Sequence, residues 1–471
     1  MATAKKHKTR IEAKCALWLA RHPAALAAPA AISTSVLELG AVTTGGIAAG
    51  VVATGLGWYR AHPASFTTHA APRIRSARRR WTRYHGRPWR TTLDACNLVT
   101  EDRRTGELHV PRIVKLSSPT PSIDVVRVRL CKGQSLRTFQ DVQEELASAL
   151  GADVLGIVKT SPRLLTLTLV HGNPFDDIVP PAEIPDEADD VDLTALELGD
   201  TEYGQSWTEP LIGQHWLIAG ATGSGKGSLL WNPLRAMGPM IRDQLVKVWM
   251  IDPKGGMETE LGRPLFHRYA TSADEPVEDE DGDDQDPMLA LLVEFRDEMK
   301  ARQEVLRDRK QRKFTVAPDT PFHVLMIDEL AMLTALGGSR ATVTAVNKIL
   351  AEILTQGRAA GFAVIAYVQE PTKDIVPVRD LFTRRIALRL GSSGYVDIVL
   401  GDDARLRGAL ADEIPETDHE GIGYRTSEKS RNPIRVRAGH TTDDDITELV
   451  RQCTPHQVPD DGSNVYAIHA A

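Results

Sequence analysis

Cysteine is scarce in this sequence, with four residues among 471 and no Cys-x-x-Cys pair. That scarcity argues against a disulfide framework and a zinc site, and it fits a reducing cytoplasm. Acidic residues are nearly absent from the first 90 positions, which hold 15 Lys or Arg but only Glu12 and Glu38. The rest of the chain is net acidic, since the whole carries a charge of -7. The asymmetry predicts a basic arm that meets membrane or nucleic acid, joined to an acidic body.

A long uncharged stretch lies inside the basic arm. Residues 39–59 contain no charged side chain, and 21 helical residues span about 30 Å, the thickness of a hydrocarbon core. Basic residues on both sides of the whole apolar region favour a short membrane hairpin with both of its ends in the cytoplasm. We therefore predict a membrane-anchoring region at 1–60 and a basic juxtamembrane segment at 61–90, with the remainder on the cytoplasmic side of the cell membrane. A cleaved signal peptide and a buried Ala/Gly-rich helix pair are the alternatives.

Residues 73–90 are rich in arginine, interleaved with Trp81, Tyr84 and Trp89. One interpretation is a clamp on anionic lipid. The other is a nucleic-acid contact, with arginines on phosphates and aromatic rings that stack on bases. The pattern leaves both open.

The remaining chain shows an α/β pattern. Residues 91–178 predict a small α/β domain, with strands at 123–130, 154–158 and 164–170 and one helix at 135–150. An acidic linker follows at 179–199, then a large domain at 200–440 and a tail at 441–471. Five apolar runs alternate with helical stretches in the large domain: 215–219, 246–251, 323–327, 363–368 and 386–390. Near-continuous apolar strands between helices predict a parallel sheet covered on both faces.

A glycine-rich loop follows the first of these runs and opens a helix, as a phosphate-binding loop must. Its backbone N–H groups would surround the phosphates of ATP, and Lys226 would reach the β- and γ-phosphates. The position after the lysine is Gly227, where a hydroxyl to Mg²⁺ is usual, so Ser228 is the candidate ligand. The predicted nucleotide-binding residues are Gly220, Ala221, Thr222, Gly223, Ser224, Gly225, Lys226, Gly227 and Ser228.

Polar residues at other strand ends complete this prediction. Asp328 and Glu329 follow the run at 323–327, where Asp328 would hold Mg²⁺ through water and Glu329 would polarise the attacking water. Gln369 follows the run at 363–368 and is a candidate sensor of the γ-phosphate. The alternatives are a helix-cap pair for the two acids and a surface turn for Gln369.

These motifs resemble the FtsK/SpoIIIE family of DNA-pumping ATPases. The matching segments are GATGSGKG at 220–227, MIDPKGG at 250–256, VLMIDEL at 324–330, GRAAGFAVIAYVQEP at 357–371 and TRRIAL at 383–388. The resemblance implies a RecA-like P-loop motor that forms a hexameric ring around double-stranded DNA. It also implies an arginine that acts across the subunit interface, for which Arg385 aligns best, with Arg384 next. Glu370 departs from the family, which usually has arginine there.

The segments GKGS and DPKGGME are most similar to transfer proteins of actinobacterial mobile elements. The sequence therefore predicts an ATP-driven translocase of double-stranded DNA in conjugative transfer of a plasmid or integrative element. A chromosome-segregation pump, a type VII protein-export motor and a non-catalytic nucleotide-binding scaffold are the alternatives. The scaffold depends on the missing hydroxyl at Gly227.

Overall fold

The computed structural model describes residues 41–102, 105–175, 178–278, 284–417, 419–427 and 430–455. The chain divides into two compact units, Met1–Arg78 and Arg79–Ala471. The described part of the first unit consists of α3 (Ala41–Ala61), α4 (Pro63–His69) and the start of α5 (Ala71–Thr82). Residues 1–40, which hold the rest of the predicted anchoring region, lie outside the described residues.

Helix α3 coincides with the uncharged residues 39–59. Five glycines and several Ala and Thr residues keep its hydropathy modest. Within the described ranges, no helix has both the length and the apolar character needed to cross a membrane.

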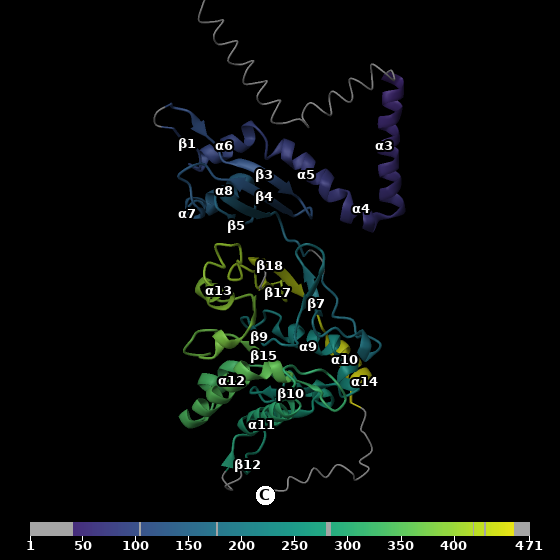
Figure 1. Cartoon of the computed structure of the whole chain (residues 1–471), viewed down its shortest axis with the longest axis vertical. Helices are drawn as coiled ribbons and strands as arrows, with labels where there is room; N and C mark the ends of the chain where they lie inside the picture. The colour runs from purple at the N-terminus through teal and green to yellow at the C-terminus, as the bar shows by residue number, and fades with distance from the viewer. Residues whose placement is uncertain are drawn as a thin grey trace, which may run out of the picture. The chain divides into compact units, whose positions relative to one another are not determined.

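The second unit begins with a small α/β domain (Figure 1). A two-stranded hairpin, β1–β2, precedes a four-stranded antiparallel sheet in the order β3-β4-β6-β5. The helix predicted at 135–150 is two helices, since regular α-helix stops at Gln140 and resumes at Gln143. Gly151 ends the second of these in the left-handed conformation (φ 64°), which glycine adopts without strain. The elements are α6 (Arg87–Ala95), β1 (Thr100–Glu101), β2 (Leu108–His109), β3 (Arg112–Ser117), β4 (Ile123–Arg129), α7 (Leu136–Gln140), α8 (Gln143–Leu150), β5 (Val154–Ser161) and β6 (Leu164–Val170).

Two aromatic residues of the arginine-rich segment belong to the core of this domain. Tyr84 and Trp89 are 3% and 5% exposed, so the prediction that they stack on nucleic-acid bases is wrong. The Tyr84 hydroxyl donates to Asp124 Oδ2 over 2.8 Å, and Arg79 Nη1 pairs with Asp124 Oδ1 at 2.5 Å. Trp81, by contrast, is 65% exposed. The segment therefore starts the small domain instead of standing apart from it.

A ten-stranded sheet forms the centre of the large domain, in the order β11-β10-β14-β15-β9-β16-β17-β18-β7-β8. The strands from β11 to β16 are parallel, and those from β16 to β8 pair antiparallel. The five strands that the apolar runs predicted are parallel, as expected, but the sheet as a whole is mixed because four further strands join it antiparallel. Its strands are β7 (Leu196–Thr201), β8 (Ser206–Glu209), β9 (Trp216–Ala219), β10 (Val246–Asp252), β11 (Arg268–Thr271), β14 (Phe322–Ile327), β15 (Phe362–Val368), β16 (Arg384–Leu388), β17 (Ile422–Ser427) and β18 (Ser430–Ala438).

Helices cover both faces of this sheet, as predicted, because alternate strand residues enter two separate apolar clusters. The helices α9 (Lys226–Ala236), α10 (Gly238–Arg242) and α14 (Asp443–Cys453) pack on one face. On the other lie α11 (Pro287–Asp308), α12 (Arg340–Ala360) and α13 (Ser393–Leu400), and Figure 1 shows α11 close to α12. Short elements complete the domain: η1 (Ala188–Asp190), η2 (Glu260–Leu265), β12 (Val277–Glu278), β13 (Asp284–Gln285), η3 (Met332–Leu336) and η4 (Arg379–Leu381).

Parts of the predicted linker and tail belong to this core. Leu193 and Leu196 from the linker are buried there. Ile446 and Leu449 of α14 are buried as well, so residues 441–455 form part of the domain instead of a free tail.

Candidate nucleotide-binding site

The predicted site residues other than Arg385 gather at one edge of the sheet, where the carboxyl ends of the parallel strands meet. Backbone hydrogen bonds continue past the strands there: Gly220 N donates to Val368 O over 3.0 Å, and Asp328 N donates to Ile251 O over 3.1 Å. On the other flank, Ala221 N donates to Arg389 O over 2.7 Å. The strand order β10-β14-β15-β9-β16 therefore places the glycine-rich loop between Gln369 and Arg389, with Asp328 one strand further away. Open α/β sheets bind ligands at such an edge.

The loop between β9 and α9 has the backbone that a phosphate cradle needs. Gly223 and Gly225 have φ of 70° and 90°, in the left-handed region that favours glycine. A Cβ atom on Gly225 would lie 2.2 Å from Gly421 N, and one on Gly220 would lie 2.4 Å from Ser224 Oγ. Helix α9 begins at Lys226, so its N-terminal N–H groups and its dipole face the loop.

Lys226 reaches back across this loop. Its Nζ donates to the carbonyl oxygens of Gly220 (2.6 Å) and Ala221 (3.0 Å). Burial lowers the pKa of Lys226, opposed by the charge of Glu329. Ser224 lies beside it at 2% exposure, and its Oγ has no hydrogen-bond partner among the described residues. A half-buried cation and an unpaired hydroxyl inside a glycine cradle fit the phosphates of a nucleotide.

Glu329 is a buried carboxylate in which one oxygen accepts a hydrogen bond and the other accepts none from the described residues. Its Oε1 accepts from Gln369 N over 3.3 Å, while its Oε2 has no hydrogen-bond partner in the described part of the chain. Burial raises the pKa of Glu329, opposed by the charge of Lys254. A carboxylate of raised pKa with a free oxygen is suited to accept a proton from water.

Gln369 is joined to the phosphate loop directly. Thr222 Oγ1 donates to Gln369 Oε1 over 3.0 Å, which links the end of β15 to the tip of the loop. The backbone N–H of Gln369 also donates to the Glu329 carboxylate. Gln369 is therefore no isolated turn residue, and it connects the loop with the acidic strand end.

Three charged residues at this edge had no assigned role in the sequence. Lys254 Nζ lies 2.7 Å from Asp328 Oδ2. Arg389 Nη2 donates to Thr222 O over 2.6 Å, and its Nη1 pairs with Glu416 Oε1 at 2.9 Å. Glu258 follows β10 in the same loop as Lys254. Their positions in the sequence could have indicated them. Lys254 and Glu258 follow Asp252, and Arg389 follows Leu388, at the ends of strands that the apolar runs predicted.

The metal-binding prediction rests on Asp328 and Ser228. Among the described residues, no group of three or more His, Cys, Asp or Glu is placed to hold an ion alone. Mg²⁺ in nucleotide sites needs only one or two side chains besides phosphates and water, and buried Asp328 fits that role. Ser228 Oγ, however, accepts a hydrogen bond from Thr441 N over 3.2 Å. The hydroxyl is thus engaged with the segment that leads into α14.

Arg385 is not brought to this edge within its own chain. It lies near the start of β16, opposite Leu217 of β9, whereas the loop follows the end of β9. Its Nη2 is 3.6 Å from Asp380 Oδ1, and its Nε donates to Phe382 O over 3.3 Å. Burial lowers the pKa of Arg385, opposed by Asp380.

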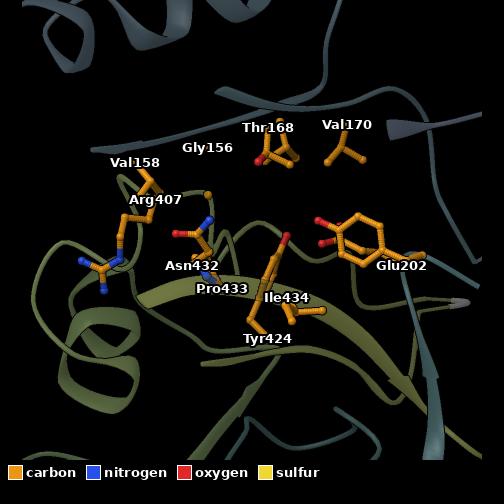
Figure 2. Close-up of a pocket in the computed structure, with 13 residues that line it drawn as sticks. Gly156, Val158, Thr168, Val170, Glu202, Arg407, Tyr424, Asn432, Pro433 and Ile434 are labelled. Atoms are coloured by element: carbon orange, nitrogen blue, oxygen red, sulfur yellow. The ribbon is translucent and has the colours of Figure 1, made fainter. Parts of the chain in front are cut away.

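A cavity of about 190 Å³ lies away from the loop, between strands of the small domain and β17–β18 (Figure 2). Glu202 lines it at 6% exposure, and Figure 2 shows this side chain and Arg407 at opposite ends. Burial raises the pKa of Glu202 to about 7, opposed by the Arg435 N–H and charge.

Comparison with known proteins matches residues 192–404 to the FtsK/SpoIIIE family. The chain is 30% identical over 317 residues to the protein Tra of Streptomyces lividans, covering 63% of this chain and 46% of that protein. It is 22% identical over 349 residues to the DNA translocase FtsK of Staphylococcus aureus strain Mu50, covering 72% of this chain and 42% of that protein. The chain thus spans less than half the length of these curated relatives.

Among solved structures, the chain is similar to the pCW3 conjugation coupling protein TcpA in its monomer form with ATPγS. That likeness has a TM-score of 0.49 and 18% identity, covering 77% of this chain and 98% of TcpA. The phosphate loop at 220–228, the acidic pair at 328–329 and Gln369 all lie within the segment 192–404 that matches the family. Residues 192–404 therefore match the FtsK/SpoIIIE family, and the resemblance that the sequence motifs indicated is confirmed over this segment.

Proposed function

We propose that the chain is an ATP-driven translocase of double-stranded DNA that acts in conjugative transfer of a plasmid or integrative element. The observation that carries the ATPase part is the convergence of Lys226, Glu329 and Gln369 at one sheet edge around a glycine cradle. The DNA and transfer parts are supported by the family match and by the similarity to a Tra protein and an FtsK translocase.

The residues suggest a division of labour during hydrolysis. Lys226 exchanges its backbone carbonyl contacts for the β- and γ-phosphates, since a phosphate oxygen is a stronger acceptor for a cation. Glu329 orients and deprotonates water through its uncommitted oxygen. Asp328 would hold Mg²⁺ through water, and the bound ion would neutralise charge on the phosphates. Gln369 transmits the state of the loop through its bond to Thr222.

The proposal includes a hexameric ring around DNA, in which Arg385 of one subunit serves the nucleotide of its neighbour. Its position away from the same-chain loop is compatible with an action in trans. We also propose that the N-terminal region associates with the cell membrane, with the large domain on the cytoplasmic side. This rests on the uncharged residues 39–59 and on the arginines of α5.

A DNA-stimulated ATPase assay tests the core of the proposal. The fragment used should start at residue 71, because removal of Arg79, Tyr84 and Trp89 would take core contacts from the small domain. Stimulation by double-stranded DNA, and displacement of a third strand from a triplex, support a DNA pump. ATPase activity unaffected by DNA would favour an export motor, and nucleotide binding without turnover would favour a scaffold.

Membrane association needs a separate measurement on the full chain. We expect it in the membrane fraction after cell lysis, with the fragment from residue 71 in the supernatant. Carbonate extraction then separates surface attachment from insertion. Recovery of the full chain in the supernatant before extraction would contradict the proposed location.

A further inference from the structure

Gly227 leaves a gap in the magnesium-binding part of the phosphate loop. The residue after the loop lysine supplies the hydroxyl that binds Mg²⁺ in P-loop proteins, and glycine has none. The next hydroxyl along the chain, on Ser228, accepts from Thr441 N and is held against the segment before α14. A carboxylate from another segment of the chain would close this gap, if one lies within reach of Gly227.

One side chain occupies the space in front of Gly227. A Cβ atom built on Gly227 would lie 3.8 Å from Glu258 Oε2, and no other described atom outside its own helix and chain neighbours falls within 4 Å. The distance is ordinary van der Waals contact, so the carboxylate reaches the place where a side chain at position 227 would extend. Glu258 comes from the loop after β10, which also carries Lys254 on Asp328.

The surroundings of Glu258 suit a divalent cation next to phosphates. Glu258 lies within electrostatic range of two carboxylates and two ammonium groups, those of Asp328, Asp252, Lys226 and Lys254. A carboxylate oxygen is a hard ligand that Mg²⁺ prefers, and one or two carboxylates beside phosphates are its usual protein ligands. Burial and neighbouring charges act on the Glu258 carboxylate, and no hydrogen bond to it is found among the described residues.

We propose that Glu258 supplies the magnesium-binding group that Gly227 lacks, by reaching across from the β10 loop to the start of α9. The proposal rests on the proposed function, since it assumes that the loop binds Mg²⁺ with ATP. It assigns the ligand to a different segment of the chain, so that metal affinity depends on the position of the loop at 253–259.

The test measures nucleotide binding and needs no turnover. Fluorescence of N-methylanthraniloyl-ATP on the full chain is titrated with Mg²⁺, and bound Mn²⁺ is counted by electron paramagnetic resonance. The Glu258→Gln variant should need about tenfold or more Mg²⁺ for half-maximal tightening, because one ligand of the ion is lost. Its binding of the nucleotide without metal should equal that of the parent, which also shows that it is folded.

A second-site change gives the sharper test. Adding Gly227→Ser to Glu258→Gln should return the Mg²⁺ curve to within about twofold of the parent, since it restores a ligand at the same place. Glu260→Gln is the matched control, because Glu260 lies in the same segment but pairs with Arg263 at the surface. A purely structural role for Glu258 would lower thermal stability without rescue by Gly227→Ser.

The outcomes distinguish failure of the Glu258 assignment from failure of the proposed function. A Glu258→Gln curve identical to the parent overturns this inference and leaves the proposed function intact. A shifted curve for Ser228→Ala together with an unshifted one for Glu258→Gln assigns the ligand to Ser228 instead. A parent that does not bind the nucleotide at all overturns the proposed function itself.

Discussion

Lys254 Nζ lies 2.7 Å from Asp328 Oδ2, so a lysine from the end of β10 neutralises the carboxylate at the end of β14. Burial acts to lower the pKa of Lys254, but the hydrogen bond and charge of Asp328 outweigh it and raise that pKa. The lysine therefore stays charged at neutral pH, and a Mg²⁺ ion must share Asp328 with it or displace it.

Lys254→Met should lower the Mg²⁺ concentration needed for tight nucleotide binding by severalfold. The change removes a cation that competes with the metal for Asp328, and charge interactions at such short range are worth about 1 kcal/mol or more. The direction is opposite to that expected for Glu258→Gln. An increased Mg²⁺ requirement in Lys254→Met would show that the lysine holds Asp328 in place for the metal instead of competing with it.

Lys226→Ala should abolish nucleotide binding and hydrolysis, because it removes the cation that holds the β- and γ-phosphates. Binding is measured by fluorescence of the labelled nucleotide and hydrolysis by phosphate release. Lys348→Ala is the control, since Lys348 is exposed on α12. Equal binding by Lys226→Ala and the control would refute the assignment of the loop.

Glu329→Gln should retain ATP binding and reduce turnover by about 10²-fold or more, since an amide cannot accept the proton from water. The change keeps the size of the side chain and its acceptor for Gln369 N–H. Glu370→Gln is the control, because Glu370 is an exposed carboxylate next to Gln369. Its turnover should stay within twofold of the parent, or about 0.4 kcal/mol. Unchanged turnover in Glu329→Gln would remove this residue from the proposed mechanism.

Arg385 should act across a subunit interface. We expect Arg385→Ala alone and Lys226→Ala alone to be inactive, while a mixture regains part of the DNA-stimulated hydrolysis. The mixture contains interfaces where an intact loop meets an intact arginine. Arg384→Ala makes a contrast, because Arg384 Nε lies 3.9 Å from the buried carboxylate of Glu209 and the change should mainly lower stability. If Arg385→Ala folds normally and mixing restores nothing, Arg389 becomes the next candidate.

Stability should fall as pH rises through neutrality because of Glu202. Its pKa is raised to about 7 in the folded chain, against 4.5 for the free side chain. The stabilisation is full below about pH 4.5 and is lost as pH rises to about 7, amounting to at most about 3 kcal/mol. Glu202→Gln stays neutral and should flatten this part of the pH profile of thermal unfolding. A parent profile with the same slope as the variant would contradict the prediction.

The parallel half of the sheet was predictable because its strands are buried on both faces. The strands β9, β10, β14, β15 and β16 all fall within two residues of the apolar runs that predicted them. The antiparallel half carries no such runs. The strand β18 reads SRNPIRVRA, in which polar and apolar residues alternate and a proline interrupts, so composition alone hides it.

In the candidate site, too, residues in local sequence motifs were predictable, and contacts between segments distant in the sequence were not. The glycine pattern and the strand-end acids are local signals, and the structure places Lys226, Glu329 and Gln369 together. The pairing of Lys254 with Asp328 depends on β10 lying next to β14, which no segment of the chain reveals by itself. The burial of Tyr84 is equally non-local, because its hydroxyl donates to Asp124, which lies 40 residues away on β4.

The pairing of β7 with β18 delays completion of the large domain's sheet until the end of synthesis. Thr201 lies opposite Val436, so the first part of the domain to leave a ribosome pairs with nearly the last. Until β18 has been synthesised, β7 and β8 have no sheet to join, and their edge is open to other chains. Such distant pairing slows folding, because a long loop must close before its contacts form. Chains that stop short of residue 436 should therefore collect as aggregates during expression, even though every residue of the phosphate loop is already present.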